Sequence, residues 1–166
     1  LLDIKMKDGS GFDLVKKLIQ LNRRYGQGGK DGNNISFAIL GGHGTDGSIQ
    51  FGSQTPDGIL TTGELDARSE KIADKFRNYF EEEAPLTLFS CSTGKEGGIA
   101  HQLAHIIDTT VIGPEGVSKT PKIEAAKDKG KITLEVTYPD EVATKIWTPN
   151  DPIDIPHLLY EDLPSN

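Results

Sequence analysis

The sequence predicts an α/β domain with a mostly parallel central sheet. Two short apolar runs, residues 35–40 and 86–89, are bounded by turn residues, which is typical of strands buried on both faces of a parallel sheet. Extended and helical patterns alternate along the chain, which favours strand–helix–strand units. With 166 residues, the chain is long enough for a single sizeable core. We therefore expect one domain, built as a three-layer sandwich around that sheet.

Local patterns predict the order of the elements. Strands are expected at residues 2–6, 35–40, 86–89, 110–113 and 131–138, with a small hairpin arm at 47–52. Helices are expected at residues 12–21, 62–83 and 97–107, with Ser10 and Thr62 as candidate caps of the first two. Glycine-rich residues 26–34 predict a loop before the second strand.

The last part of the chain predicts less regular structure. Residues 131–138 alternate cleanly, as expected for an exposed or edge strand, and the lysines between residues 119 and 131 predict a solvated loop. From Thr148 onward prolines recur, which favours an irregular tail or linker. We therefore expect the domain to span residues 1–148 and the tail to span residues 149–166. This expectation is compatible with a domain that lacks the first strand of its fold.

Composition excludes several classes of function. The net charge is −7 and the basic residues are dispersed, whereas nucleic-acid binding needs clustered Lys and Arg. No stretch approaches the ~20 apolar residues of a membrane-spanning helix. A single cysteine excludes an internal disulfide, which favours the cytoplasm. The chain begins at Leu1 and is expected to be a fragment, so secretion as part of a larger protein is the alternative.

Two chemically capable residues follow the two apolar runs. His43 lies in a glycine-rich stretch after the first run, and Cys91 follows Ser90 after the second. Because the carboxyl ends of parallel strands meet at one edge of a sheet, we expect His43 and Cys91 to lie near each other there. A thiolate is a strong nucleophile, and a neighbouring imidazole can take its proton. The pair therefore predicts a catalytic Cys–His dyad.

These residues resemble the caspase-haemoglobinase fold of cysteine peptidases. Members carry a His-Gly pair after one apolar strand and a cysteine that follows Ala or Ser after the next, as His43-Gly44 and Ser90-Cys91 do here. His43 and Cys91 are 48 residues apart, close to the roughly 50 of caspases. Residues 35–116 are most similar to bacterial caspase-like domains, such as CHAT domains and the self-processing protease domains of large bacterial toxins.

The resemblance implies a cysteine endopeptidase that uses no cofactor and no metal. Cys91 would attack the peptide carbonyl, and His43 would manage the protons. The backbone N–H groups of Gly44 and Cys91 would form the oxyanion hole. The start of the helix expected after Cys91 would favour the thiolate through its dipole. The implied partners are protein or peptide substrates, and other domains of a parent chain if the domain processes itself.

Nearby carboxylates predict which residue is preferred before the cleaved bond. Asp46, Asp57 and Glu115 lie on loops that should flank Cys91, and an acidic pocket would select Lys or Arg. Residues 111–116 are expected to form a wall of this pocket, and Ser90 is placed with Asp46 and Glu115 as a substrate-binding residue. We therefore expect cleavage after basic residues.

Two alternatives stay open at this stage. A homologue that keeps the fold without the activity would be a scaffold or a regulatory interaction domain, and free cysteines are often simply small buried side chains. His101 and His105 are four residues apart on an expected helix, as in zinc helices. However, Gln102 stands where a metalloprotease has its Glu, and no third ligand is evident nearby. Two polar surface histidines are the more ordinary explanation.

Overall fold

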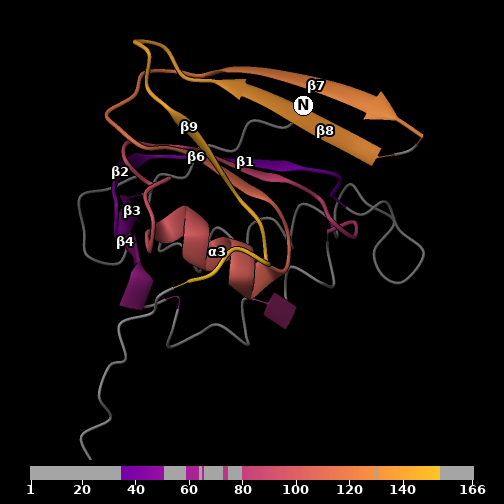
Figure 1. The fold of residues 1–166 in the computed structure, drawn as a ribbon, viewed down its shortest axis with the longest axis horizontal. Coiled ribbons are helices and arrows are strands. Elements are labelled where there is room, and N and C mark those ends of the chain that lie inside the picture. Colours follow the sequence, from indigo (N-terminus) through magenta and orange to yellow (C-terminus); the bar gives the residue numbers. More distant parts are fainter. Residues whose placement is uncertain are drawn as a thin grey trace, which may run out of the picture.

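A four-stranded sheet lies at the centre of the structure, a computed structural model that describes residues 35–50, 59–63, 65, 73–74, 80–129 and 131–153. Its strands, in spatial order, are β1 (Ala38–Gly41), β5 (Leu86–Phe89), β6 (Val111–Pro114) and β9 (Thr144–Trp147) (Figure 1). The first three run parallel, and β9 is antiparallel to β6. The domain is therefore α/β with a mostly parallel sheet, which confirms that part of the prediction.

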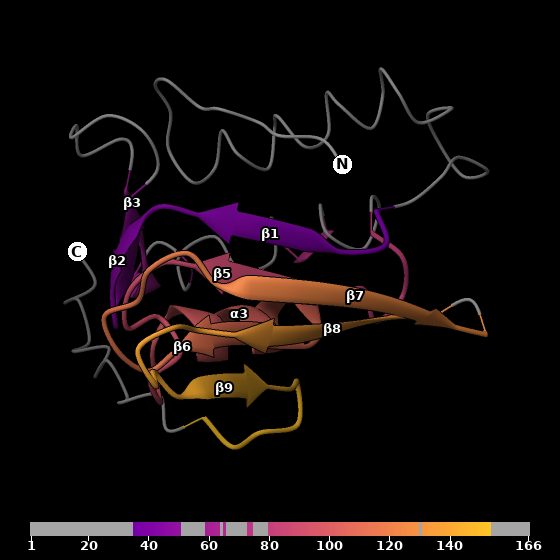
Figure 2. The same cartoon turned by 90° about the horizontal axis from the view of Figure 1, so that it is seen from above.

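A second, smaller sheet lies beyond the carboxyl end of β1. It consists of β2 (His43–Thr45), β3 (Ser48–Gln50) and β4 (Ile59–Thr61), and each strand is antiparallel to the next. The hairpin arm expected at residues 47–52 is thus part of a three-stranded sheet. Figure 2 shows β2 and β3 on the side toward which the arrowheads of β1 and β5 point.

The helix α3 (Ile99–Ile107) covers one face of the central sheet. Its apolar side chains are buried at helical spacing, so they form one continuous stripe against the sheet. The buried core there includes Leu86, Leu88, Ile99, Leu103, Ala104, Ile107, Val111 and Trp147. The helix ends at Asp108, whose backbone adopts the left-handed conformation with φ 54°. The predicted helix at residues 97–107 is confirmed, with a start two residues later.

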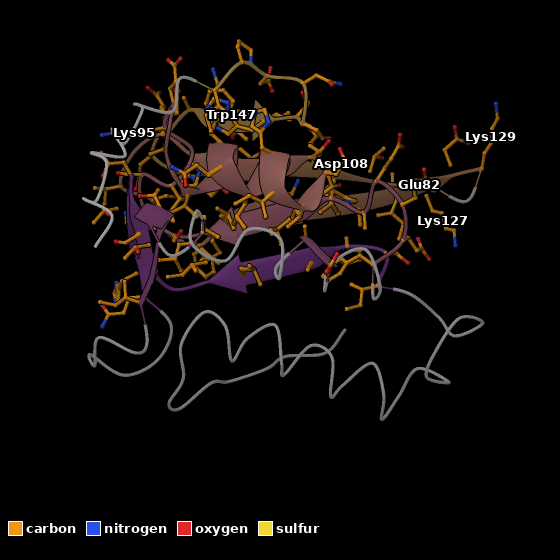
Figure 3. All side chains as sticks on the ribbon, turned by 90° about the horizontal axis from the view of Figure 1, so that it is seen from below. Glu82, Lys95, Asp108, Lys127, Lys129 and Trp147 are labelled. Carbon is orange, nitrogen blue, oxygen red and sulfur yellow. The ribbon has the colours of Figure 1, made fainter. Side chains whose placement is uncertain are left out.

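A long hairpin, β7 (Lys122–Asp128) paired with β8 (Lys131–Thr137), covers the opposite face of the sheet (Figure 1). A second apolar cluster joins Ile112 of the sheet to Val136 and Tyr138, with Ile123 and Leu134 packed against them. The prediction of a loop at residues 119–131 is therefore wrong for residues 122–128, because these residues pair with β8 and form the strand β7. Lys127 and Lys129 lie near the projecting tip of this hairpin (Figure 3).

Several other expectations have mixed outcomes. The strand at residues 2–6, the helix at 12–21 and the loop at 26–34 lie outside the described residues. Backbone at Thr62, Gly63, Leu65, Ala73 and Asp74 is helical, but the predicted helix does not reach Glu83. Phe80 instead forms an isolated parallel bridge with Ile35, and residues 81–83 are non-helical. Residues 148–153 are irregular, as expected for the start of the tail. No helix within the described ranges is long and apolar enough to cross a membrane.

Candidate active site at the carboxyl edge of the parallel sheet

His43 and Cys91 follow neighbouring parallel strands at equivalent positions. In the register of β1 and β5, Gly41 is paired with Phe89, and each of the two candidate residues stands two positions further along its own chain. The Gly42 N–H donates to the Phe89 carbonyl at 3.0 Å, so the strands stay together one residue beyond the sheet. The topology therefore delivers both residues to one edge, where open α/β sheets place their ligands.

The His43 imidazole is exposed at the first position of β2, where the backbone pairs with Gln50. Within the described part of the chain, this imidazole has no hydrogen-bond partner. The structure thus shows the backbone position of His43 in β2 and the exposure of its side chain.

The Cys91 thiol is half-buried and belongs to a loop of residues 90–98, the Cys91 loop, between β5 and α3. Its Sγ atom donates a hydrogen bond to the Ser118 carbonyl at 3.7 Å. The next residue, Ser92, has φ 58°, a left-handed conformation that costs energy for a residue with a side chain. The Ser92 N–H donates to the Gly116 carbonyl at 2.8 Å, which helps to hold this strained turn in place.

Gly44 packs directly against the Cys91 backbone. A Cβ atom at this position would lie 2.8 Å from the Cys91 carbonyl oxygen and 2.9 Å from the Cβ atom of Ser90. Real Cβ atoms do not approach that closely, so a larger residue could stand here only if the Cys91 loop shifted. Glycine is thus required at position 44 by the close approach of two backbone segments.

The backbone donors expected to form an oxyanion hole are available. Thr45 and Ser48 flank a two-residue turn as a hydrogen-bonded pair, so Gly44 and Ile49 form the next, non-hydrogen-bonded pair. The Gly44 N–H therefore faces away from β3, toward the open edge of β2. Counting only partners among the described residues, neither this N–H nor that of Cys91 is hydrogen-bonded.

The helix after Cys91 has its first backbone donors occupied. The Ile99 N–H donates to the Asp46 carbonyl at 3.0 Å, and the Ala100 N–H donates to the Thr93 carbonyl at 3.0 Å. These two bonds tie α3 to the turn of the small sheet and to the Cys91 loop. Any influence of α3 on Cys91 must therefore come from the dipole of the helix, since these two donors are already used.

The residues expected to bind substrate lie in different environments. Asp46 and Glu115 are exposed, and the Asp46 Oδ1 atom accepts from the Gly47 N–H at 3.0 Å. Ser90 is buried, and its hydroxyl donates to Thr93 Oγ1 at 3.1 Å. The Ser90 side chain thus stabilises the turn that carries Cys91. Asp57 lies outside the described residues.

Two aromatic residues that the sequence analysis did not single out hold the Cys91 loop and its strand. The Trp147 Nε1–H donates to the Gly94 carbonyl at 2.7 Å, and the Tyr138 hydroxyl donates to the Leu88 carbonyl at 2.6 Å. Burial raises the pKa of Tyr138, so the phenol stays protonated and remains a donor. Both contacts join residues at least 50 positions apart. The available signal was that Trp147 is the single tryptophan of the chain.

His101 is fully buried, which corrects the expectation that it is a surface residue. Its ring stacks on Trp147 with centroids 3.7 Å apart and an interplanar angle of 11°, and Figure 3 shows Trp147 beside α3. The Gly97 N–H donates to His101 Nδ1 at 3.1 Å, so the neutral ring carries its proton on Nε2. Burial lowers the pKa of His101 and outweighs the opposing effect of the Asp151 backbone carbonyl.

The same geometry disfavours zinc at His101 and His105. His105 Nε2 donates to the Asp151 carbonyl at 2.6 Å, while the Asp151 carboxylate accepts from the backbone N–H and hydroxyl of Thr148. These bonds from Thr148 lower the pKa of Asp151. His101 Nε2 has no hydrogen-bond partner within the described ranges. Over those same residues, no group of three or more His, Cys, Asp or Glu side chains could hold a metal ion.

The comparisons with known proteins identify a family. Residues 19–134 match the family described as "Domain of unknown function (DUF8616)". The match covers more than half of the chain, so the chain belongs to that family. It spans both His43 and Cys91. No curated protein and no solved structure matches the chain significantly.

Proposed function

We propose that this domain is a cysteine endopeptidase of the caspase-haemoglobinase fold, with Cys91 as nucleophile and His43 as general base and acid. The observation that carries the proposal is the register of β1 and β5, because it puts the two residues at equivalent positions beyond adjacent parallel strands. The unpaired N–H groups of Gly44 and Cys91 within the described residues support it, since acyl transfer needs donors for the developing oxyanion.

The chemistry follows from these groups. The Cys91 thiolate attacks the peptide carbonyl carbon, and the carbonyl oxygen takes the negative charge and accepts from the Gly44 and Cys91 N–H groups. His43, which has received the thiol proton, gives it to the leaving amine as the C–N bond breaks. Water then attacks the thioester while His43 takes one of its protons, which releases the acid and restores the thiol. The substrate would be a protein, including a parent chain that contains this domain.

A preference for Lys or Arg before the cleaved bond is part of the proposal. Asp46 and Glu115 are both exposed. The Asp46 carbonyl accepts from the Ile99 N–H directly after the Cys91 loop, and Gly116, next to Glu115, accepts from the Ser92 N–H of that loop. We propose that one of these two carboxylates contacts the bound peptide. A carboxylate pairs with either basic side chain and binds Arg through two parallel hydrogen bonds. Ser90 is a weaker candidate for substrate contact than the sequence alone indicated, because its side chain is buried and its hydroxyl donates to Thr93.

A catalytically silent interaction domain is the second candidate. The observation that favours it is the state of the two residues: the Cys91 thiol is bonded to the Ser118 carbonyl, and His43 is exposed without a partner in the described part of the structure. In a working dyad, the imidazole and the sulfur must come within hydrogen-bond reach during the reaction. The proposal therefore requires that the site rearranges when substrate binds.

Peptide hydrolysis by single-site variants separates the two candidates. We expect wild-type protein to cleave a library of fluorogenic peptides, with the highest rates for Arg and Lys before the cut. Cys91→Ala should abolish cleavage, and His43→Ala should lower it by a factor of at least about 100, the usual contribution of general acid–base catalysis. Thr45→Ala is the matched control, because it removes another exposed side chain from β2 and should retain the activity.

Two results would contradict parts of this proposal. Undiminished cleavage by folded Cys91→Ala protein would exclude Cys91 as the nucleophile. Cleavage after Asp, Asn or Leu would exclude the acidic pocket and leave the Cys–His mechanism intact. Folding of each variant is checked by circular dichroism and thermal unfolding.

A further inference from the structure

The segment of residues 115–119, which we call the strap, lies against the Cys91 thiol. The thiol donates to the Ser118 carbonyl at 3.7 Å, so the strap occupies the side of the sulfur on which this carbonyl lies. A reagent or a substrate carbonyl that approaches the sulfur from this side must first displace the strap.

The strap reaches the thiol through a regular backbone pairing. The Gly94 N–H donates to the Pro114 carbonyl and the Ser92 N–H to the Gly116 carbonyl, both at 2.8 Å. The residue numbers run in opposite directions along the two segments, so the pairing is antiparallel and uses alternate residues. Ser118 is the next alternate residue, and its carbonyl is taken by the Cys91 thiol. The path of the strap thus leads directly to this contact.

The two ends of the strap are held with different strength. At its start, the Glu115 N–H donates to the Ala143 carbonyl at 3.0 Å, in addition to the bond from Ser92 to Gly116. At its end, the Lys119 Nζ atom pairs with Asp140 Oδ2 at 3.0 Å, but these side chains are 78% and 59% exposed. Exposed ion pairs contribute only about 0–1 kcal/mol. Val117 is 79% exposed and adds little packing. Between Gly116 and Lys122, where β7 begins, the segment around Ser118 is therefore held more weakly than the start of the strap.

We propose that the strap is an autoinhibitory cover, which shields the Cys91 sulfur until its Ser118 end lifts. The ion pair between Lys119 and Asp140 determines how often the Ser118 end moves away from the thiol. The inhibitory role rests on the proposed peptidase function, whereas the cover over the thiol does not. A substrate peptide would replace the Ser118 carbonyl beside Cys91.

Alkylation of Cys91 by iodoacetamide measures the cover without requiring catalysis. We expect Lys119→Ala and Asp140→Asn to raise the second-order rate of alkylation by about two- to fivefold, which corresponds to the strength of an exposed ion pair. Lys119→Glu should raise the rate further, because two carboxylates then repel each other. Combining Lys119→Glu with Asp140→Lys should bring the rate back toward that of the wild type.

The chain offers a closely matched control in Lys122→Ala. Lys122 and Glu124 also form an exposed pair at 3.0 Å, with side chains 70% and 59% exposed, but they belong to β7. Lys122→Ala makes the same change in net charge as Lys119→Ala and should leave the alkylation rate unchanged. A rate that rises equally in both variants, or in neither, would overturn the cover.

Peptide hydrolysis by the same variants separates the two proposals. If the peptidase and the cover are both correct, the variants that alkylate faster also cleave faster. Faster alkylation without hydrolysis by any variant would support the cover and contradict the peptidase. Hydrolysis by the wild type with unchanged alkylation and cleavage in the Lys119 variants would support the peptidase and contradict the cover.

Discussion

The two sides of the Cys91 loop differ in how firmly they are held. On the side of α3, Thr93 and Gly94 are buried, and the Trp147 indole, stacked on His101, donates to the Gly94 carbonyl. On the opposite side, His43 is exposed without a partner in the described residues, and the thiol donates a hydrogen bond to Ser118 in the weakly held end of the strap. The Cys91 loop is thus held firmly on the side of α3 and Trp147, which we call its back. It is held weakly on the side of His43 and Ser118, which we call its front.

This difference is what a reactive loop requires. A nucleophile must be positioned to within a fraction of an ångström, which is achieved by packing and hydrogen bonds behind it. The groups in front must stay free to bind a ligand or to move. The comparison therefore predicts that changes behind the loop act mainly on stability, while changes in front also alter the reactivity of Cys91. Three predictions test this division, from the largest expected effect to the smallest.

Removing the indole behind the loop should have the largest effect. Trp147→Ala takes away a buried aromatic side chain and the bond to the Gly94 carbonyl, and should lower the free energy of unfolding by about 3–5 kcal/mol. Trp147→Phe keeps an aromatic ring against His101 and loses the bond, and should cost about 1–2 kcal/mol. Urea unfolding of both variants gives these values.

The neighbouring residue provides the control for this experiment. Ile146 lies on the same strand and is 57% exposed, so Ile146→Ala should change the free energy of unfolding by no more than about 0.5 kcal/mol. Equal destabilisation by the Trp147 and Ile146 variants would mean that β9 contributes as a whole strand, with no special role for the indole.

The three parallel strands of the central sheet could be predicted from local sequence, because their own residues require burial. β5 and β6 are almost entirely buried, and their apolar residues predict this burial even when the neighbouring strand is unknown. The seven residues of β7 are mostly exposed, and its strand conformation follows from pairing with β8. β9 is equally dependent on its pairing with β6. Sequence patterns do not report such partners, so these two strands were missed.

The features of the candidate site also differ in whether local sequence could predict them. The placement of His43 and Cys91 at one edge follows from two local signals, each an apolar run that ends in a turn. The bond from Cys91 to Ser118 depends on the path of a loop 27 residues away, and the support from Trp147 depends on a strand 53 residues from Gly94. The apolar spacing of α3 shows that a face is buried, but the stacking partner of His101 is set by β9.

An extra methyl group in front of the loop should have an intermediate effect. Gly44→Ala places a carbon 2.8 Å from the Cys91 carbonyl oxygen, so either β2 or the Cys91 loop must move. Such overpacking costs about 1–3 kcal/mol. The shift should also change the iodoacetamide alkylation rate of Cys91 at least about twofold, because the thiol contact with Ser118 is weak.

Gly47→Ala is a matched control from the same hairpin. A Cβ atom there would meet only the Thr62 hydroxyl, at an ordinary distance of 3.8 Å. This variant should unfold like the wild type and keep its alkylation rate. If Gly44→Ala also left both quantities unchanged, the close packing of β2 on the Cys91 loop would be contradicted.

The smallest expected effect is a dependence of stability on pH that arises from His101. Its pKa is lowered in the folded protein, chiefly by burial, so the unfolded chain binds more protons than the folded one near the ordinary pKa of 6.5. The free energy of unfolding should therefore fall as the pH drops from 7 toward 5. Protonation would also place a proton on Nδ1, where the Gly97 N–H now donates, and would break that bond. The contribution of His101 is thus present above pH 6.5 and is lost below it.

Urea unfolding at several pH values between 7 and 5 isolates this contribution. The charge of His105 lowers the pKa of His101, whereas the charges of Asp151 and Glu96 raise it, and burial outweighs all three effects. His101→Phe keeps an aromatic ring at this position and cannot titrate, so its free energy of unfolding should vary less over this range than that of the wild type. Equal slopes in the wild type and His101→Phe would show that His101 titrates alike in the folded and unfolded states. The lowered pKa of Asp151 acts separately, because its contribution is lost only as the pH falls below its ordinary value of 3.8.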